Sequence, residues 1–122
     1  MRKKELTEEL EKLGLSAEQA ELYIAGLKLG ASLLAPLAKE AHIPRTSAYA
    51  LIEQLERERL FNTIPSGRRI LHQAAAPTQL LKRVLDQEHI VRELLPFLES
   101  LTPKPLDAST SRDNKRQLTI DL

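Results

Sequence analysis

Apolar residues recur at helical intervals along the N-terminal part of the chain. Leu6, Leu10 and Leu13 mark a first helix on a charged segment, and Gly14 is expected to end it. Ser16 is then expected to cap a second helix, with Gln19 completing a capping box. The apolar residues of this second helix, which ends at Gly30, predict a broad apolar surface, with Tyr23 packed in the core: Ala20, Tyr23, Ile24, Leu27 and Leu29.

Two further helices are predicted on either side of Pro44. Leu37, Ala38 and Ala41 form the apolar face of a short helix. Pro44 disfavours a helical conformation at Ile43, so the chain should turn there and begin a new helix near Pro44 or Arg45. The core stripe of that helix is predicted at Ala48, Leu51, Ile52 and Leu55. Two short helices joined by a tight turn are typical of a helix-turn-helix.

After Leu60 the periodicity changes from helical to extended. Residues 61–64 and 69–73 are predicted strands, and Pro65-Ser66-Gly67 between them is a predicted turn. A hairpin that follows a helix-turn-helix predicts a winged helix-turn-helix. The expected fold is therefore mainly α with a small β-wing, followed by a long C-terminal helix.

Residues 78–101 are predicted to form that long helix. Its apolar seam alternates in steps of four and three: Leu80, Val84, Gln87, Val91, Leu94, Leu98 and Leu101. We therefore predict a dimerisation helix, with Gln87 fixing the register. Pro96 is expected to kink the helix or break it near Leu94-Leu95, and a broken helix would fold back on its own domain instead of pairing.

These patterns divide the chain into three parts. A winged helix-turn-helix domain is expected over residues 5–76, a dimerisation helix over 77–101 and a polar tail over 102–122. Most of the tail lacks apolar periodicity and cannot fold alone. Its last residues, 117–122, alternate like a strand, which is suited to adding to a sheet edge or pairing with a partner chain.

Composition excludes several function classes. Cysteine is absent, which excludes disulfides and thiolate metal sites. The glycines stand singly, without a phosphate-binding loop, and the three histidines lack metal-ligand spacing; His72 and His89 are expected on the surface. We predict no catalytic residues, no metal and no cofactor, and hence a protein that is not an enzyme. Because no signal peptide or membrane span is evident, a cytoplasmic location without membrane partners is expected.

The charge pattern points to a nucleic-acid partner. The net charge is only +1, from 18 basic and 17 acidic residues, but cations exceed carboxylates between Lys39 and Arg69. Hydrogen-bond donors gather on the first two turns of the helix after Pro44, where they can reach phosphates or base edges: Arg45, Thr46, Ser47 and Tyr49. Farther along, Glu53, Glu56 and Glu58 would repel a DNA backbone, so only the first two turns are expected to enter a groove. Arg68 and Arg69, at the hairpin tip, are expected to meet flanking phosphates or the minor groove.

From Leu13 to Ala76 the chain resembles the DNA-binding domain of the TrmB family of transcriptional regulators. The resemblance rests on LGLSAEQAELYIAGLKLG, on LAKEAHIPRTSAYALIEQLE, and on an arginine-rich wing followed by an Ala-Pro that starts a long helix. It implies a winged helix that binds promoter DNA, usually as a dimer, so double-stranded DNA and a second copy are the expected partners. By the same resemblance, Arg45, Thr46, Ser47 and Tyr49 begin the recognition helix (about 45–59), and Arg68 and Arg69 belong to the wing (about 61–73).

The chain departs from this family pattern at three points. His42 stands where members often have glycine, although histidine is enriched among non-glycine residues in left-handed turns. Leu33-Leu34-Ala35-Pro36 replaces a small polar cap. Many relatives also carry a C-terminal sugar-binding domain, for which Leu122 leaves no room, so neither a sugar response nor another small-molecule effector is predicted.

Two alternatives from the same fold remain open. A winged helix can serve only as a protein-interaction module, since the fold alone does not decide function. Such a module would carry apolar residues at Thr46, Ala50 and the wing, whereas donors dominate here. RNA binding, or a role as a general transcription factor, is not distinguished by the sequence.

Overall fold

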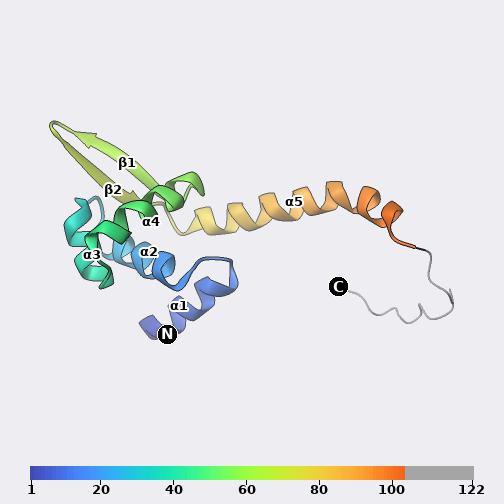
Figure 1. Ribbon diagram of the computed structural model, residues 1–122, viewed down its shortest axis with the longest axis horizontal. Helices are drawn as coiled ribbons and strands as arrows, with labels where there is room; N and C mark the ends of the chain where they lie inside the picture. The colour runs from blue at the N-terminus through green and yellow to red at the C-terminus, as the bar shows by residue number, and fades with distance from the viewer. Residues whose placement is uncertain (104–122) are drawn as a thin grey trace. The chain divides into compact units, whose positions relative to one another are not determined.

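The computed structural model describes residues 1–103 as a mainly helical protein with one β-hairpin (Figure 1). Its elements in chain order are α1 (Lys3–Lys12), α2 (Ala17–Leu29), α3 (Leu34–Ala41), α4 (Arg45–Arg57), β1 (Phe61–Ser66), β2 (Arg69–Ala74) and α5 (Thr78–Leu101). The chain divides into two compact units, Met1–Val84 and Leu85–Leu122, so the division falls within α5. The predicted strand at 117–122, like nearly all of the predicted tail, lies outside the described residues.

Side-chain hydrogen bonds begin α2 at the position predicted for it. The Ser16 hydroxyl accepts a hydrogen bond from the Gln19 amide at 3.1 Å, and the Gln19 side chain accepts one from the Ser16 amide at 2.9 Å. This confirms the capping box, which satisfies two amides that the helix leaves unpaired. Gly14 has φ +102°, a conformation that favours glycine, and Leu15 beyond it is buried.

The core of the first unit lies where α2, α3 and α4 meet the base of the hairpin. The rings of Tyr23 and Phe61 meet there edge to face, with centroids 6.5 Å apart. The Tyr23 hydroxyl donates to the Ala75 carbonyl at 3.0 Å, and burial raises the pKa of this phenol. The predicted core role of Tyr23 is confirmed. The largest fully buried side chains are Tyr23, Phe61, Leu22, Leu37, Ile52, Leu55 and Leu60.

Gly26, in the middle of α2, allows the hairpin to pack closely on that helix. A Cβ at Gly26 would lie 2.5 Å from Cζ of Phe61 and 2.9 Å from Cβ of Ala74. A glycine inside a helix costs about 1 kcal/mol relative to alanine. Here that cost is offset by the packing of Phe61 against α2, which holds the base of the hairpin on the helical core.

The hairpin pairs from Phe61↔Ala74 to Ser66↔Arg69, so Gly67 and Arg68 form its two-residue turn. The turn predicted at Pro65-Ser66-Gly67 is therefore misplaced, because Pro65 and Ser66 complete β1. Gly67 has φ +63°, and proline is tolerated in an edge strand.

A bridge from the segment before α3 extends the sheet on its other side. The Ser32 amide donates to the His72 carbonyl at 2.9 Å, and the His72 amide donates to the Ser32 carbonyl at 2.7 Å. This pairing was not predicted. It fixes the start of α3 to β2.

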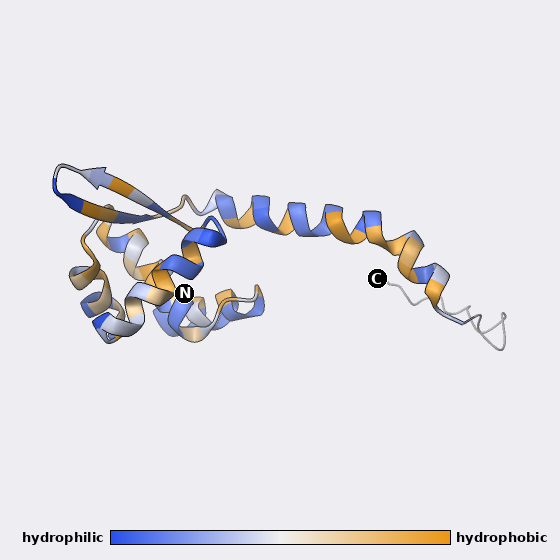
Figure 2. Cartoon of the chain, turned by 45° about the horizontal axis from the view of Figure 1, so that its top comes forward, coloured by the Kyte–Doolittle hydropathy of each residue, from blue (hydrophilic) through white to orange (hydrophobic). Residues whose placement is uncertain are grey.

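α5 has the bounds predicted for it, and its apolar residues recur along its length (Figure 2). The helix continues through Pro96 to Leu101, so the alternative of a break near Leu94-Leu95 is wrong. Within the described residues no side chain of α5 is buried, although Leu80 packs partly against the core of the first unit. The apolar seam left exposed therefore begins at Val84. No helix within residues 1–103 is both long enough and apolar enough to span a membrane.

Candidate nucleic-acid interface

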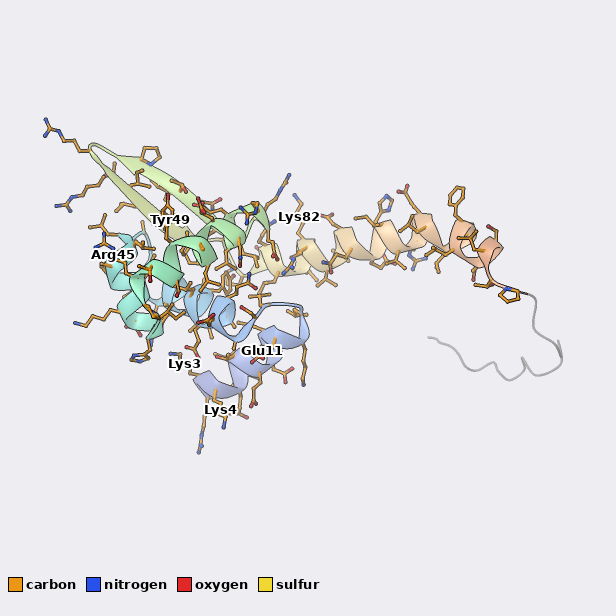
Figure 3. All side chains as sticks on the ribbon, in the orientation of Figure 1. Lys3, Lys4, Glu11, Arg45, Tyr49 and Lys82 are labelled. Carbon is orange, nitrogen blue, oxygen red and sulfur yellow. The ribbon has the colours of Figure 1, made fainter. Side chains whose placement is uncertain are left out.

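The first two turns of α4 present the predicted donors to solvent. Arg45, Thr46, Ser47 and Tyr49 are all exposed, and Figure 3 shows Arg45 and Tyr49 along α4 near the hairpin. Ala48 among them is fully buried, which fixes the rotation of the helix about its axis. Pro44 precedes α4 and no side chain caps the helix, so its first amides and the positive end of its dipole are available to an anion. This arrangement is suited to contact with a phosphate.

The turn between α3 and α4 sets how these donors are presented. His42 adopts the left-handed conformation, with φ 58° and ψ 43°, as expected for the place where family members often have glycine. The Ile43 amide donates to the Ala38 carbonyl at 2.9 Å, which closes α3 in the manner of a Schellman motif. Ile43 is itself buried, so the turn is anchored in the core.

Carboxylates occupy the C-terminal half of α4 and the residue that follows it. Glu53 is exposed, whereas Glu58 pairs with Arg83 of α5 at 2.5 Å. Glu56 turns toward the hairpin, where its Oε2 accepts a hydrogen bond from the Thr63 hydroxyl. The distribution of charge along α4 thus favours a phosphate contact at the N-terminal end and opposes one at the C-terminal end.

The two arginines predicted for the wing lie at the tip of the hairpin. Arg68 occupies the second position of the turn, and Arg69 is the first residue of β2; both side chains are exposed. The hairpin projects from the helical core, with its turn at the far end (Figure 1). These cations are therefore carried away from the domain on a two-stranded arm.

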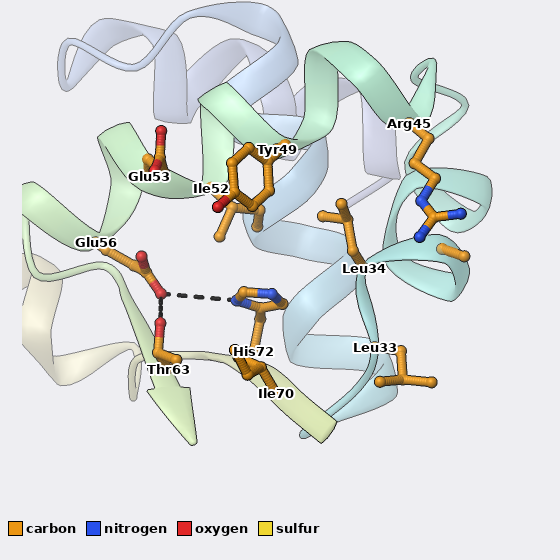
Figure 4. Close-up of a pocket in the computed structure, with 11 residues that line it drawn as sticks. Leu33, Leu34, Arg45, Tyr49, Ile52, Glu53, Glu56, Thr63, Ile70 and His72 are labelled. Atoms are coloured by element: carbon orange, nitrogen blue, oxygen red, sulfur yellow. Dashed lines mark hydrogen bonds and ion pairs between the residues drawn. The ribbon is translucent and has the colours of Figure 1, made fainter. Parts of the chain in front are cut away.

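The sequence-based prediction placed His72 on the surface, and this prediction is wrong. His72 is 8% exposed, and its Nδ1 lies 3.6 Å from Oε2 of Glu56 (Figure 4). His72, Thr63 and Glu56 thus bring the C-terminal end of α4 against both strands of the hairpin. His89, by contrast, is exposed on α5 as predicted.

The sequence carried a weak signal for the position of His72. It alternates with Ile70 and Ala74, so the three residues share one face of β2. Nothing in the spacing indicated that this face would meet Glu56, which lies on a different element. In residues 1–103, no group of three or more histidine, cysteine, aspartate or glutamate side chains is arranged to hold a metal ion.

Comparisons with known proteins agree with this architecture. A family model described as sugar-specific transcriptional regulator TrmB matches residues 10–78. No curated protein matches the chain. Among solved structures, TrmBL2, described as an archaeal chromatin protein with a novel mode of DNA binding, is similar with a TM-score of 0.74 and 24% identity. The similarity covers 82% of this chain and 39% of that one, so this chain corresponds to well under half of TrmBL2.

Two other solved structures share the fold at lower similarity. A MarR-family transcriptional regulator from Silicibacter pomeroyi has a TM-score of 0.53 and 16% identity, over 93% of this chain and 77% of that one. MepR from S. aureus, solved as a DNA complex, has a TM-score of 0.50 and 18% identity, over 78% and 87% of the two chains. At these identities the similarity shows only that the proteins share a fold.

Proposed function

The chain belongs to the TrmB family of sugar-specific transcriptional regulators, and on that premise we propose that it binds promoter DNA as a dimer and regulates transcription. The observation that carries the proposal is the exposed start of α4 next to the arginine-tipped hairpin. Arg45, Thr46, Ser47 and Tyr49 contact base edges and phosphates of the major groove. Arg68 and Arg69 hold the adjacent backbone or the minor groove.

Dimerisation is proposed through α5. Val91 is 52% exposed, Leu94 46% and Leu98 50%, although all three belong to the predicted seam. A single chain leaves this seam in water, and pairing with a second copy would bury it at about 25 cal/mol per Å² of apolar surface. Two copies would then place two recognition helices on one duplex, which suits an operator with two half-sites.

The first test is a fluorescence-anisotropy titration of the protein against its own upstream promoter region and against a scrambled duplex, at low and at physiological salt. Preferential binding to the promoter, weakening as salt rises, is the expected result. Absence of binding to either duplex at low salt would overturn the proposal in favour of a protein-interaction module.

Replacing both wing arginines, Arg68→Ala with Arg69→Ala, should weaken binding to every duplex. The slope of log affinity against log salt should become flatter by about 0.9 for each phosphate that the variant no longer neutralises, because fewer counterions are released. The matched control is Arg2→Ala with Lys4→Ala, which removes the same charge from exposed positions at the N-terminal end of the chain; Figure 3 shows Lys4 on the side of the domain opposite the hairpin. Equal slopes for the two double variants would show that the wing does not touch DNA.

Arg45→Ala should act differently, by reducing the preference for the promoter. A well-placed arginine contact to a base is worth about 1–3 kcal/mol of discrimination, so affinity for the promoter should fall by about tenfold or more while binding to the scrambled duplex changes less. Arg57→Ala, at the exposed C-terminal end of the same helix, is the control and should have little effect. If Arg57→Ala proved as damaging as Arg45→Ala, the orientation proposed for α4 would be wrong.

A further inference from the structure

A cavity of about 350 Å³ lies between α4, the segment that begins α3, and the hairpin. We call it the wing pocket. It falls in the size range of small-molecule sites. Figure 4 shows Arg45 at one end and Glu56 at the other. These two residues are separated by three turns of α4, or roughly 16 Å along its axis, so the pocket has a cationic end and an acidic end.

The acidic end contains a buried polar atom without a partner. The His72 side chain is 10% exposed, and its Nδ1 makes no hydrogen bond within the described residues. Oε2 of Glu56 is 3.6 Å away from this nitrogen, which is too far for a hydrogen bond. A buried nitrogen without a hydrogen-bond partner lowers the stability of the folded protein unless a bound group supplies one.

Apart from the Thr63 hydroxyl, which donates to Oε2 of Glu56, the other groups at this end are hydrogen-bond acceptors or an aromatic face. Glu56 and Glu53 contribute two carboxylates from successive turns of α4, and Tyr49 contributes its ring beside them (Figure 4). In its neutral form with the proton on Nε2, His72 also accepts at Nδ1. The group that satisfies all of them is a positively charged donor, which bonds to carboxylate and imidazole and is attracted to the aromatic face.

The walls between the two ends are apolar. Leu33 and Leu34 line the pocket from the start of α3, Ile52 from α4, and Ile70 from β2. Such walls suit the hydrocarbon body of a ligand rather than a hydrated inorganic ion. We propose that the wing pocket binds a small amphipathic amine, with its ammonium group donating to Glu56 and to Nδ1 of His72 and its apolar part lying against these side chains.

This site goes beyond the proposed function and is tested without DNA. Arg45 and Tyr49 line the pocket and are also proposed DNA contacts, so ligand and DNA would use some of the same side chains. Binding of the amine is nevertheless measured on the free protein. If the protein binds the amine but not DNA, only the proposed function fails. If it binds DNA but not the amine, only the proposal for the wing pocket fails.

The experiment is an NMR titration of the ¹⁵N-labelled full chain with three probes that share one aromatic body. Phenethylamine is a cation at pH 7, 2-phenylethanol is neutral and phenylacetate is an anion. We expect saturable shifts at the amides of His72, Thr63 and Tyr49 with phenethylamine. Its affinity should exceed that of phenylacetate by about tenfold or more, because the carboxylates attract one probe and repel the other.

Glu56→Gln should lower the affinity for phenethylamine by about tenfold, since it removes the charge opposite the ammonium group. Glu53→Gln should lower the affinity for phenethylamine severalfold. Glu53 is exposed, so this substitution should not disturb folding. The control Glu18→Gln removes the same charge from an exposed position of α2 and should leave the affinity unchanged. The proposal is overturned if no probe gives saturable shifts at the pocket, if phenylacetate binds as tightly as phenethylamine, or if neither pocket glutamate matters.

Discussion

Replacing Val91 and Leu98 of α5 with aspartate is expected to prevent the pairing of two copies that we propose for α5, leaving a monomer. Both side chains are about half exposed in the single chain and belong to the seam proposed to pair two copies. In the dimer each aspartate would be buried opposite an apolar residue or a second carboxylate, and a buried unpaired charge is strongly unfavourable. Sedimentation or light scattering should give the mass of one chain.

Loss of the dimer should also weaken promoter binding, by roughly a hundredfold or more. Two linked recognition helices bind with an effective concentration that a single helix lacks, and the linkage contributes factors of about 10²–10⁴. Anisotropy titrations of the variant and the parent protein, at the same salt, measure this loss.

The matched control places the same charges on the opposite side of the helix. His89→Asp with Ser100→Asp adds two carboxylates at exposed positions outside the seam and should preserve the dimer. Circular dichroism of both double variants checks that α5 remains helical. A dimer that survived Val91→Asp with Leu98→Asp would show that the seam is not the interface.

Phe61→Ala is expected to lower the free energy of unfolding by about 3–5 kcal/mol. The Phe61 side chain is 1% exposed and fills the space between Tyr23 and the bare backbone of Gly26. Its removal leaves a cavity that the rigid junction of helix and hairpin cannot close. Because a domain of this size has a total stability of about 5–15 kcal/mol, this loss is a large fraction of the total.

Urea unfolding at fixed protein concentration, followed by circular dichroism, measures this effect. Ile70→Ala provides the comparison, because Ile70 is a large apolar residue of the same hairpin that is 57% exposed. It should cost less than about 1 kcal/mol. Equal destabilisation by the two variants would contradict the placement of Phe61 in the core.

Most of the fold could be predicted because local signals agreed with one another. The capping box at Ser16 and the heptad spacing of α5 each act over a few residues, so they can be recognised without tertiary information. The left-handed position at His42 was indicated by the resemblance to the TrmB family. The change of period after Leu60 predicted the hairpin. The turn was misplaced because Pro65 and Gly67 are both turn formers, and only the strand register shows which of them lies in the turn.

The candidate DNA-binding residues were predicted from sequence at Arg45, Thr46, Ser47, Tyr49, Arg68 and Arg69, and the structure exposes all six. Their contact with DNA stays a prediction. Exposure could be foreseen because each side chain lies opposite or beside a stripe of apolar residues, or at a hairpin tip. Pairing through α5 likewise remains a prediction, since it concerns a second copy.

The sequence by itself determined the helices, the hairpin and the polar face of α4, because hydrophobic periodicity and capping are properties of neighbouring residues. Only the tertiary structure decided that His72 is buried, that it faces Glu56, and that a pocket lies between α4 and the wing. The physical reason is that these features depend on how one element is rotated and placed against another. That placement is set by long-range packing, here by Phe61 on Gly26 and by the pairing of Ser32 with His72.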